Sequence, residues 1–257
     1  MTKIIGVIPA RMGSSRFPGK PLYNIAGMPM IEHVWHRAKL YKKWDKLFLA
    51  TCDNEIKDFA ISKNIPCIMT SNEHKRALER VAEAIEKCGI EVKPDDITIN
   101  VQGDEPMMSP EMITTVVKPL IEDEGVNGTV LSLPIIDKKI FNDPNTLKII
   151  NNLKGDILFT SRAPIPYHKN WSPDGSAKRI YGIFAFRWNY LKKFNELPES
   201  PLELAESCDS NRLYDNEMTQ RVALHPYMES FSVDSIEDAK KVEKFIKLDP
   251  YWKLYSN

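Results

Sequence analysis

Three cations lie close together near the start of the chain: Arg11, Arg16 and Lys20. They follow residues 3–8, an apolar run typical of a β-strand that is buried on both faces. In an open α/β sheet, ligands bind just beyond the carboxyl ends of the strands. Guanidinium and ammonium groups at that place suit a polyphosphate, which carries several negative charges. The spacing therefore predicts a triphosphate-binding loop, against the alternative of a solvated basic turn.

The residues between these cations are small or polar. Gly13 and Gly19 let the backbone come close to a ligand, and Ser14 and Ser15 add hydroxyl donors. The G-x-x-x-x-G-K-[ST] pattern of a Walker A loop does not occur. The nucleotide-binding residues predicted in this stretch are Ala10, Arg11, Gly13, Ser14, Arg16 and Lys20.

Two aspartates each follow a short apolar run, and Asp104 is predicted to lie at the carboxyl end of a strand. Asp104 comes after the expected strand 96–101, and Asp234 precedes Ser235. Mg²⁺ binds one or two carboxylates and completes its shell with phosphate oxygens and water, so either aspartate suits it. The alternatives are a tight turn at Asp104 and a helix N-cap at Asp234, although Ser235 can supply that cap.

The elements that must position these residues alternate in the first half of the chain. Strands are predicted at 3–8, 46–51, 67–70 and 96–101, and helices at 30–41, 54–63 and 78–88. Such alternation predicts right-handed crossovers and a mainly parallel sheet.

The second half has a different pattern, in which strands are joined by turn-rich segments. Strands are predicted at 129–135, 147–150, 157–160 and 182–186, and helices at 201–212 and 235–248. The strands indicate antiparallel pairs in an α+β extension. We therefore predict one domain over residues 1–257, with an inserted lobe at about 129–190.

Composition excludes several functional classes. The 257 residues include 35 basic and 35 acidic side chains, so a formal net charge of zero argues against a nucleic-acid binder or a basic membrane surface. The four cysteines have no CxxC spacing, which argues for reduced thiols rather than zinc or disulfides. The first apolar run is too short for a signal peptide or a membrane span. We expect a cytoplasmic protein that binds neither nucleic acid nor membrane.

Six motifs follow one another along nearly the whole chain. They occupy residues 8–22, 25–34, 50–53, 101–106, 159–166 and 233–238. Together they closely resemble the motifs of the 3-deoxy-manno-octulosonate cytidylyltransferases, or CMP-Kdo synthetases. The resemblance implies an α/β fold: a Rossmann-like nucleotidyltransferase domain with a mixed, mainly parallel sheet, which forms a homodimer through its inserted lobe.

The resemblance also implies a reaction. Asp104 and Asp234 would hold the cofactor Mg²⁺, and the anomeric hydroxyl of a sugar acid would attack the α-phosphorus of CTP in line, releasing pyrophosphate. Arg11, Arg16 and Lys20 would stabilise the leaving charge. The catalytic residues that we predict are Arg11, Lys20 and Asp104. The product would be a CMP-sugar for surface polysaccharide or lipopolysaccharide.

Further residues are assigned by the resemblance to the sugar-acid side. They are Arg80, Gln102, Ser161, Arg162, Glu206 and Arg212. Gln102 is expected to contact the nucleotide as well, and Arg162 suits a carboxylate.

Two segments depart from the family pattern. The family reads His-Gln-Ser-Gly-Thr-Glu-Arg where residues 74–80 read His-Lys-Arg-Ala-Leu-Glu-Arg, and Ile180 and Phe184 replace a His and a Tyr. These changes remove hydrogen-bonding groups, so we expect an altered acceptor: Kdo, a modified Kdo, or another acidic or phosphorylated acceptor. The alternatives are an enzyme of the same fold with another acceptor or nucleotide, and a non-catalytic nucleotide-binding relative.

Overall fold

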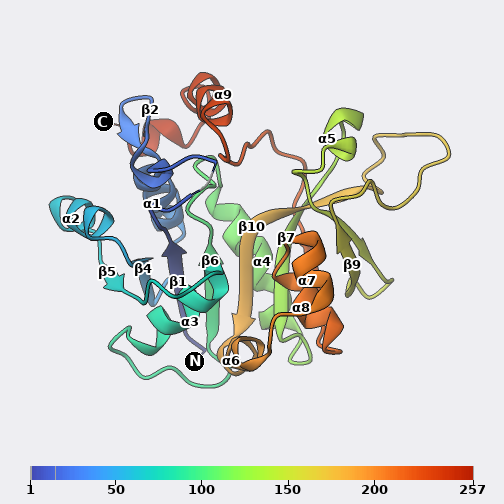
Figure 1. Ribbon diagram of the computed structural model, residues 1–257, viewed down its shortest axis with the longest axis horizontal. Helices are drawn as coiled ribbons and strands as arrows, with labels where there is room; N and C mark the ends of the chain where they lie inside the picture. Colours follow the sequence, from blue (N-terminus) through green and yellow to red (C-terminus); the bar gives the residue numbers. More distant parts are fainter. Residues whose placement is uncertain (1, 15, 257) are drawn as a thin grey trace.

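The computed structural model describes residues 2–14 and 16–256, and a nine-stranded mixed sheet runs through its centre (Figure 1). The predicted strands of the first half are confirmed. They are β1 (Ile4–Pro9), β4 (Lys46–Thr51), β5 (Cys67–Met69) and β6 (Ile97–Val101). β1 lies between β4 and β6 and pairs with both in parallel, and β5 pairs in parallel with β4. The carboxyl ends of β1 and β6 therefore meet at one edge of the sheet.

Helices cover both faces of this sheet. They include α1 (Met30–Leu40), α2 (Asn54–Ser62), α3 (Ala77–Glu86), α4 (Pro110–Glu122) and α6 (Trp188–Glu196). Side chains alternate along a strand, and β1 follows this rule. Ile4 and Ile8 pack in the core with α1, α2 and α4, whereas Ile5 and Val7 pack in a second core with α3 and α6. Two apolar layers thus hold the sheet between the helices.

The second half of the chain adds antiparallel pairing, as predicted. Its strands in the central sheet are β7 (Gly128–Pro134), β10 (Lys178–Arg187) and β11 (Arg221–Leu224). β10 lies between β6 and β7 and is antiparallel to both, and β11 is parallel to β7. The long strand β10 therefore joins the two halves of the sheet.

A smaller part projects beyond β7 and β10, on the right of Figure 1. It contains α5 (Lys138–Asn142), β8 (Lys148–Asn151) and β9 (Ile157–Ser161). β8 pairs with β9 and with the first residues of β10, all antiparallel. Because β7 and most of β10 lie in the central sheet, the projecting part is narrower than the predicted lobe, 129–190.

The C-terminal helices differ partly from the prediction. The helix predicted at 201–212 is two helices, α7 (Pro201–Glu206) and α8 (Ser210–Asp215), because Ser207 takes a left-handed conformation with φ 49°. The last helix, α9 (Ile236–Ile246), begins as predicted after the N-cap Ser235. The short elements are η1 (Lys20–Leu22), β2 (Asn24–Ile25), β3 (Met28–Pro29) and η2 (Trp252–Leu254). Within the described part of the chain, every helix is too short or too polar to cross a lipid bilayer.

Candidate active site

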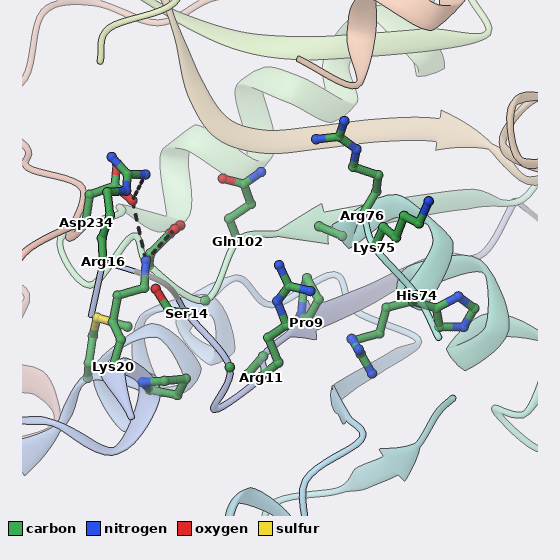
Figure 2. A pocket seen from close by; sticks show the side chains of 18 of the residues that line it. Pro9, Arg11, Ser14, Arg16, Lys20, His74, Lys75, Arg76, Gln102 and Asp234 are labelled. Atoms are coloured by element: carbon green, nitrogen blue, oxygen red, sulfur yellow. Dashed lines mark hydrogen bonds and ion pairs between the residues drawn. The ribbon is translucent and has the colours of Figure 1, made fainter. Parts of the chain in front are cut away.

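A cavity of about 460 Å³ lies at the carboxyl ends of β1 and β6 (Figure 2). Ten of the residues predicted from the sequence line it: Ala10, Arg11, Gly13, Ser14, Arg16, Lys20, Arg80, Gln102, Asp104 and Asp234. Ser15, which was also expected to offer a hydroxyl, lies outside the described residues. The structure therefore brings the predicted phosphate-binding loop and both predicted metal ligands to one place.

The loop after β1 is held in shape by its own backbone and by a buried ring. Gly19 has φ 74°, a left-handed conformation that favours glycine, and its N–H donates to the Met12 carbonyl at 3.0 Å. The Met12 N–H in turn donates to Asp53 Oδ2 at 2.7 Å. Phe17 is buried in a core that also contains Val233, the residue before Asp234. Burial of Phe17 thus fixes the loop cations beside that aspartate.

Lys20 connects the two aspartates. Its Nζ donates to Asp104 Oδ2 at 3.0 Å and to the Val233 carbonyl at 2.7 Å, and lies 3.6 Å from Asp234 Oδ1. The Val233 N–H donates to the Asp104 carbonyl at 2.9 Å, and Arg16 Nη2 lies 3.1 Å from Asp234 Oδ1. A backbone hydrogen bond and a shared ammonium group therefore hold the two carboxylates side by side.

The two carboxylates fit a divalent cation. Asp104 Oδ1 is buried and has no hydrogen-bond partner among the described residues, so it is available to a ligand. Ser235 caps α9 by accepting from the Asp238 N–H at 3.2 Å, which leaves the Asp234 side chain free of the capping role. Residues 2–14 and 16–256 contain no group of three or more His, Cys, Asp and Glu side chains that could hold a metal ion by themselves. Two carboxylates suffice for Mg²⁺ when phosphate and water complete its shell.

Two glycines allow the turn after β6 to pack closely on its neighbours. A Cβ on Gly103 would lie 2.7 Å from the Pro9 carbonyl oxygen. A Cβ on Gly182 would lie 2.7 Å from Gln102 Oε1 and 2.8 Å from Glu105 Oε1. A side chain at position 103 would therefore displace the backbone of the turn, whereas one at position 182 would displace the side chains of Gln102 and Glu105.

The altered segment 74–80 forms the opposite wall of the cavity. Figure 2 shows Arg16, Lys20 and Asp234 on one side, His74, Lys75 and Arg76 on the other, and Arg11 between them. Six Arg and Lys side chains line the cavity: Arg11, Arg16, Lys20, Lys75, Arg76 and Arg80. Its acidic side chains within the described chain are Asp104 and Asp234. This excess of positive charge suits a triphosphate.

Acidic residues of α7 and α8 hold Arg76 in place. Its Nε lies 3.4 Å from Glu203 Oε1 and 3.7 Å from Asp209 Oδ1. Burial raises the pKa of Asp209 to about 6, although the charge of Arg76 opposes this rise. Arg212 donates two hydrogen bonds of 2.7 Å to Glu203 and is 2% exposed. Arg212, a predicted acceptor contact, lines neither this cavity nor the one beside it and instead supports the wall.

A second cavity, of about 670 Å³, adjoins the first and shares part of its lining. The shared residues are Arg16, Gln102, Asp104, Ser207 and Asp234. The predicted metal ligands thus lie where the two cavities meet.

Of the predicted acceptor residues, Arg162 lines the second cavity, whereas Ser161 and Glu206 do not. Ser161 Oγ donates to Glu206 Oε1 at 2.6 Å, and the Arg162 N–H donates to Glu206 Oε2 at 2.8 Å. The Arg162 guanidinium donates to the carbonyls of Glu206 at 2.8 Å and of Pro144 at 2.9 Å. Ser161 and Glu206 therefore position Arg162. Arg80 donates to the Thr70 hydroxyl and is 3% exposed, at the edge of the first cavity.

Three residues that were not predicted also line the second cavity: Asn100, Glu105 and Arg179. Burial and the neighbouring Asp104 charge raise the pKa of Glu105 to about 7. Its Oε1 accepts from Ser232 Oγ at 2.7 Å. Asn100 could have been recognised in the sequence as a candidate site residue, because it is a polar residue within the otherwise apolar end of a buried strand.

Comparison with known proteins shows the family of the chain. Over residues 5–221 the chain matches a family described as Cytidylyltransferase. The 3-deoxy-manno-octulosonate cytidylyltransferase of Lawsonia intracellularis is 40% identical over 238 residues, which are 93% of this chain and 92% of that enzyme. The enzyme of the same name from Oleidesulfovibrio alaskensis is 38% identical over 226 residues, covering 88% and 90%.

A solved structure is also similar over almost the whole chain. CMP:2-keto-3-deoxy-manno-octonic acid synthetase complexed with CTP has a TM-score of 0.87 and 34% identity, covering 96% of this chain and 99% of that one. This similarity confirms the predicted α/β fold with a mixed, mainly parallel sheet. The match over residues 5–221 and the similar enzymes confirm the predicted family.

Proposed function

The chain belongs to the cytidylyltransferase family, a family of nucleotidyltransferase enzymes, and on this basis we propose that it joins CTP to a sugar acid of the Kdo type. The products are a CMP-sugar and pyrophosphate, and the CMP-sugar serves surface polysaccharide or lipopolysaccharide synthesis. One observation carries the proposal: Asp104 and Asp234 line both cavities at the point where they meet. A triphosphate in the first cavity and a sugar acid in the second would bring the α-phosphorus and the attacking hydroxyl together there.

Several side chains act on the nucleotide in this proposal. Arg11, Arg16 and Lys20 bind the phosphate oxygens and stabilise the negative charge that develops on pyrophosphate. Gln102 lies between the two cavities and can contact both substrates. The acceptor hydroxyl is the nucleophile, so the protein mainly positions the two substrates for in-line attack. On the acceptor side, Arg162 is the group that suits the carboxylate.

We assign the cofactor Mg²⁺ to Asp104 and Asp234. The buried Oδ1 of Asp104, which has no hydrogen-bond partner among the described residues, supports this assignment, and so does the position of both aspartates in the lining of the first cavity. When bound, Mg²⁺ neutralises the triphosphate and favours departure of pyrophosphate. We further propose that the enzyme is cytoplasmic, since its substrate CTP is cytoplasmic. We also propose that it forms a homodimer.

The test is pyrophosphate release from CTP in the presence of Mg²⁺ and a panel of sugar acids that includes Kdo, with the CMP-sugar identified by mass spectrometry. Replacing CTP by UTP, GTP or ATP in the same assay measures nucleotide selectivity. Release with the sugar acids and CTP is expected. If no acceptor supports release although CTP binds, the proposed acceptor class is wrong, which leaves an enzyme with another acceptor or a non-catalytic nucleotide-binding relative.

Asp104→Asn tests the metal site directly. We expect CTP binding to lose its dependence on Mg²⁺, and turnover to fall by roughly a hundredfold or more, because one of two charged ligands is removed. Asp58→Asn, which changes an exposed side chain on α2, is the matched control and leaves both properties unchanged. An Asp104→Asn enzyme whose CTP binding still responds to Mg²⁺ as the wild type does would rule out this assignment.

A further inference from the structure

Three apolar residues form one wall of the second cavity. They are Leu78, Ile180 and Phe184, which all line this cavity and pack in the same core. They come from α3 and β10, which are about a hundred residues apart in sequence. One wall of the proposed acceptor cavity is therefore apolar.

An unsatisfied amide stands beside this wall. The pairing of β6 with β10 places Asn100 directly opposite Phe184, and directly opposed residues point to the same face of a sheet. Asn100 lines the same cavity and is 1% exposed. Its Oδ1 and Nδ2 have no hydrogen-bond partner among the described residues. Because buried amides are nearly always paired, this side chain points to a ligand that offers it both a donor and an acceptor.

A sugar hydroxyl alone fits this arrangement poorly. A hydroxyl that faces Leu78, Ile180 and Phe184 would lose its hydrogen bonds to water and gain none from the wall. An acylamino group fits better, because it carries a carbonyl, an N–H and a methyl group. The carbonyl and N–H match the amide of Asn100, and the methyl group matches the apolar wall.

We propose that the acceptor is a sugar acid that carries an acylamino group on the side facing Leu78, Ile180, Phe184 and Asn100. This inference rests on the proposed function, since it concerns the substrate of the same reaction. It narrows the acceptor from acidic sugars in general to N-acylated ones. The attacking hydroxyl and the acid group are unchanged, so transfer to CMP proceeds as before.

The experiment compares acceptors that differ only in this group. One pair is N-acetylneuraminate and 2-keto-3-deoxynononate, which has a hydroxyl in place of the acetamido group. The other pair is 8-acetamido-8-deoxy-Kdo and Kdo. With CTP and Mg²⁺, we expect kcat/KM for pyrophosphate release to be at least tenfold higher for the acetamido member of one pair. A preference for the hydroxyl member in both pairs overturns the inference and leaves the proposed function intact. No release with any of the four acceptors overturns both.

Variants test whether the named residues cause the preference. A triple variant replaces Leu78 by Thr, Ile180 by His and Phe184 by Tyr. Its ratio of kcat/KM for the acetamido acceptor to kcat/KM for the hydroxyl acceptor is expected to fall at least tenfold, with the KM for CTP unchanged. The single change Phe184→Tyr keeps the ring and the fold, and moves the ratio in the same direction. Ile136→Thr, which alters another apolar residue of this cavity, is the control. An unchanged ratio in Phe184→Tyr and in the triple variant overturns the assignment.

Discussion

Glu105 is a carboxyl group whose surroundings favour its neutral form. It is 3% exposed and lies next to Asp104 in the chain, and its Oε2 has no hydrogen-bond partner among the described residues. Burial, followed by the charge of Asp104, raises its pKa from 4.5 to about 7. Oε1 accepts hydrogen bonds from Ser232 Oγ and the Gly182 N–H. The neutral acid keeps these contacts without adding a third negative charge to those of Asp104 and Asp234, the proposed metal ligands.

This raised pKa predicts a pH-dependent stability. Below pH 4.5 the group is protonated in both the folded and the unfolded protein. Between pH 4.5 and about 7 only the folded protein keeps the proton, so the stability that this proton provides is lost as the pH rises through that range. Glu105→Gln keeps the shape and remains neutral, so it should lack this loss. The free energy of unfolding of Glu105→Gln minus that of wild type should therefore increase by about 2 to 3 kcal/mol between pH 4.5 and 8.

Denaturant unfolding at several pH values measures this effect. Glu124→Gln, which alters an exposed carboxyl group, serves as the control and should follow the wild-type curve. Parallel curves for Glu105→Gln and wild type between pH 4.5 and 8 would show that Glu105 titrates as an ordinary glutamate.

Single residues differ in how far the sequence reveals their position. That Arg11, Lys20 and Asp104 line one cavity was predictable, because they lie in loops that follow predicted strands, and strand ends gather at one edge of a sheet. Asn100 and Glu105 were not predicted, since their unpaired atoms and their burial depend on the contacts of β6 with β10. Those contacts join segments about 80 residues apart.

At the scale of elements, α7 and α8 form a charged support for the cavity wall. Arg76 and Arg212 both approach Glu203, which is fully buried. Arg212 was predicted to contact the acceptor, but its guanidinium makes two hydrogen bonds to Glu203 and stacks on Phe194 with 4.7 Å between Cζ and the ring centroid. The hydrogen bonds that Arg212 donates to Glu203 raise the pKa of Arg212 above its ordinary value. Arg212 therefore supports the cavity wall through Glu203, which also lies beside Arg76.

Arg212→Met should accordingly reduce stability more than it changes binding. The substitution removes the ion-pair partner of Glu203 and leaves a buried negative charge poorly neutralised. This lowers the free energy of unfolding by about 3 to 5 kcal/mol. Urea unfolding measures that loss, and the KM for CTP of the folded enzyme should change less than threefold. The control is Lys118→Met, since Lys118 forms an exposed pair with Glu122 and should cost under about 1 kcal/mol. A stable Arg212→Met enzyme with a greatly raised acceptor KM would instead support the predicted direct contact.

Element prediction failed where local pattern and tertiary structure disagree. The α4 helix was missed because its middle, Ile113 to Val117, is rich in β-branched residues and its last turn contains Pro119. The single helix expected at 201–212 is interrupted by the left-handed Ser207, which a helical pattern does not reveal. Alternating strands and helices in the first half were predicted correctly, because their periodicity is local.

At the scale of the whole molecule, the two cavities result from the order of the strands. β10 returns from the projecting part and enters the sheet between β6 and β7, antiparallel to both. This brings Gly182 and Phe184 against the strand that leads to Asp104. The sequence predicted the antiparallel pairing but not this position, because pairing partners of a late strand depend on long-range contacts. The joined nucleotide and acceptor cavities are a consequence of that insertion.

The projecting part also offers apolar residues for the proposed homodimer. Leu153, at the turn between β8 and β9, is fully exposed, and Leu158 on β9 is 60% exposed. Large apolar side chains on a projecting hairpin suit burial against a second copy. Light scattering should give the wild type twice the chain mass of 29.5 kDa.

Leu158→Glu places a charge on this surface, so it should give the mass of one chain and leave the fold unchanged by circular dichroism. Leu248→Glu changes a leucine after α9 that is 80% exposed and lies away from the hairpin, and should leave the dimer intact. A monomeric wild type would refute the dimer itself. In a two-fold contact on this hairpin, the glutamates of the two subunits would be buried close to each other and would repel. A dimeric Leu158→Glu protein would therefore show that the interface lies elsewhere on the molecule.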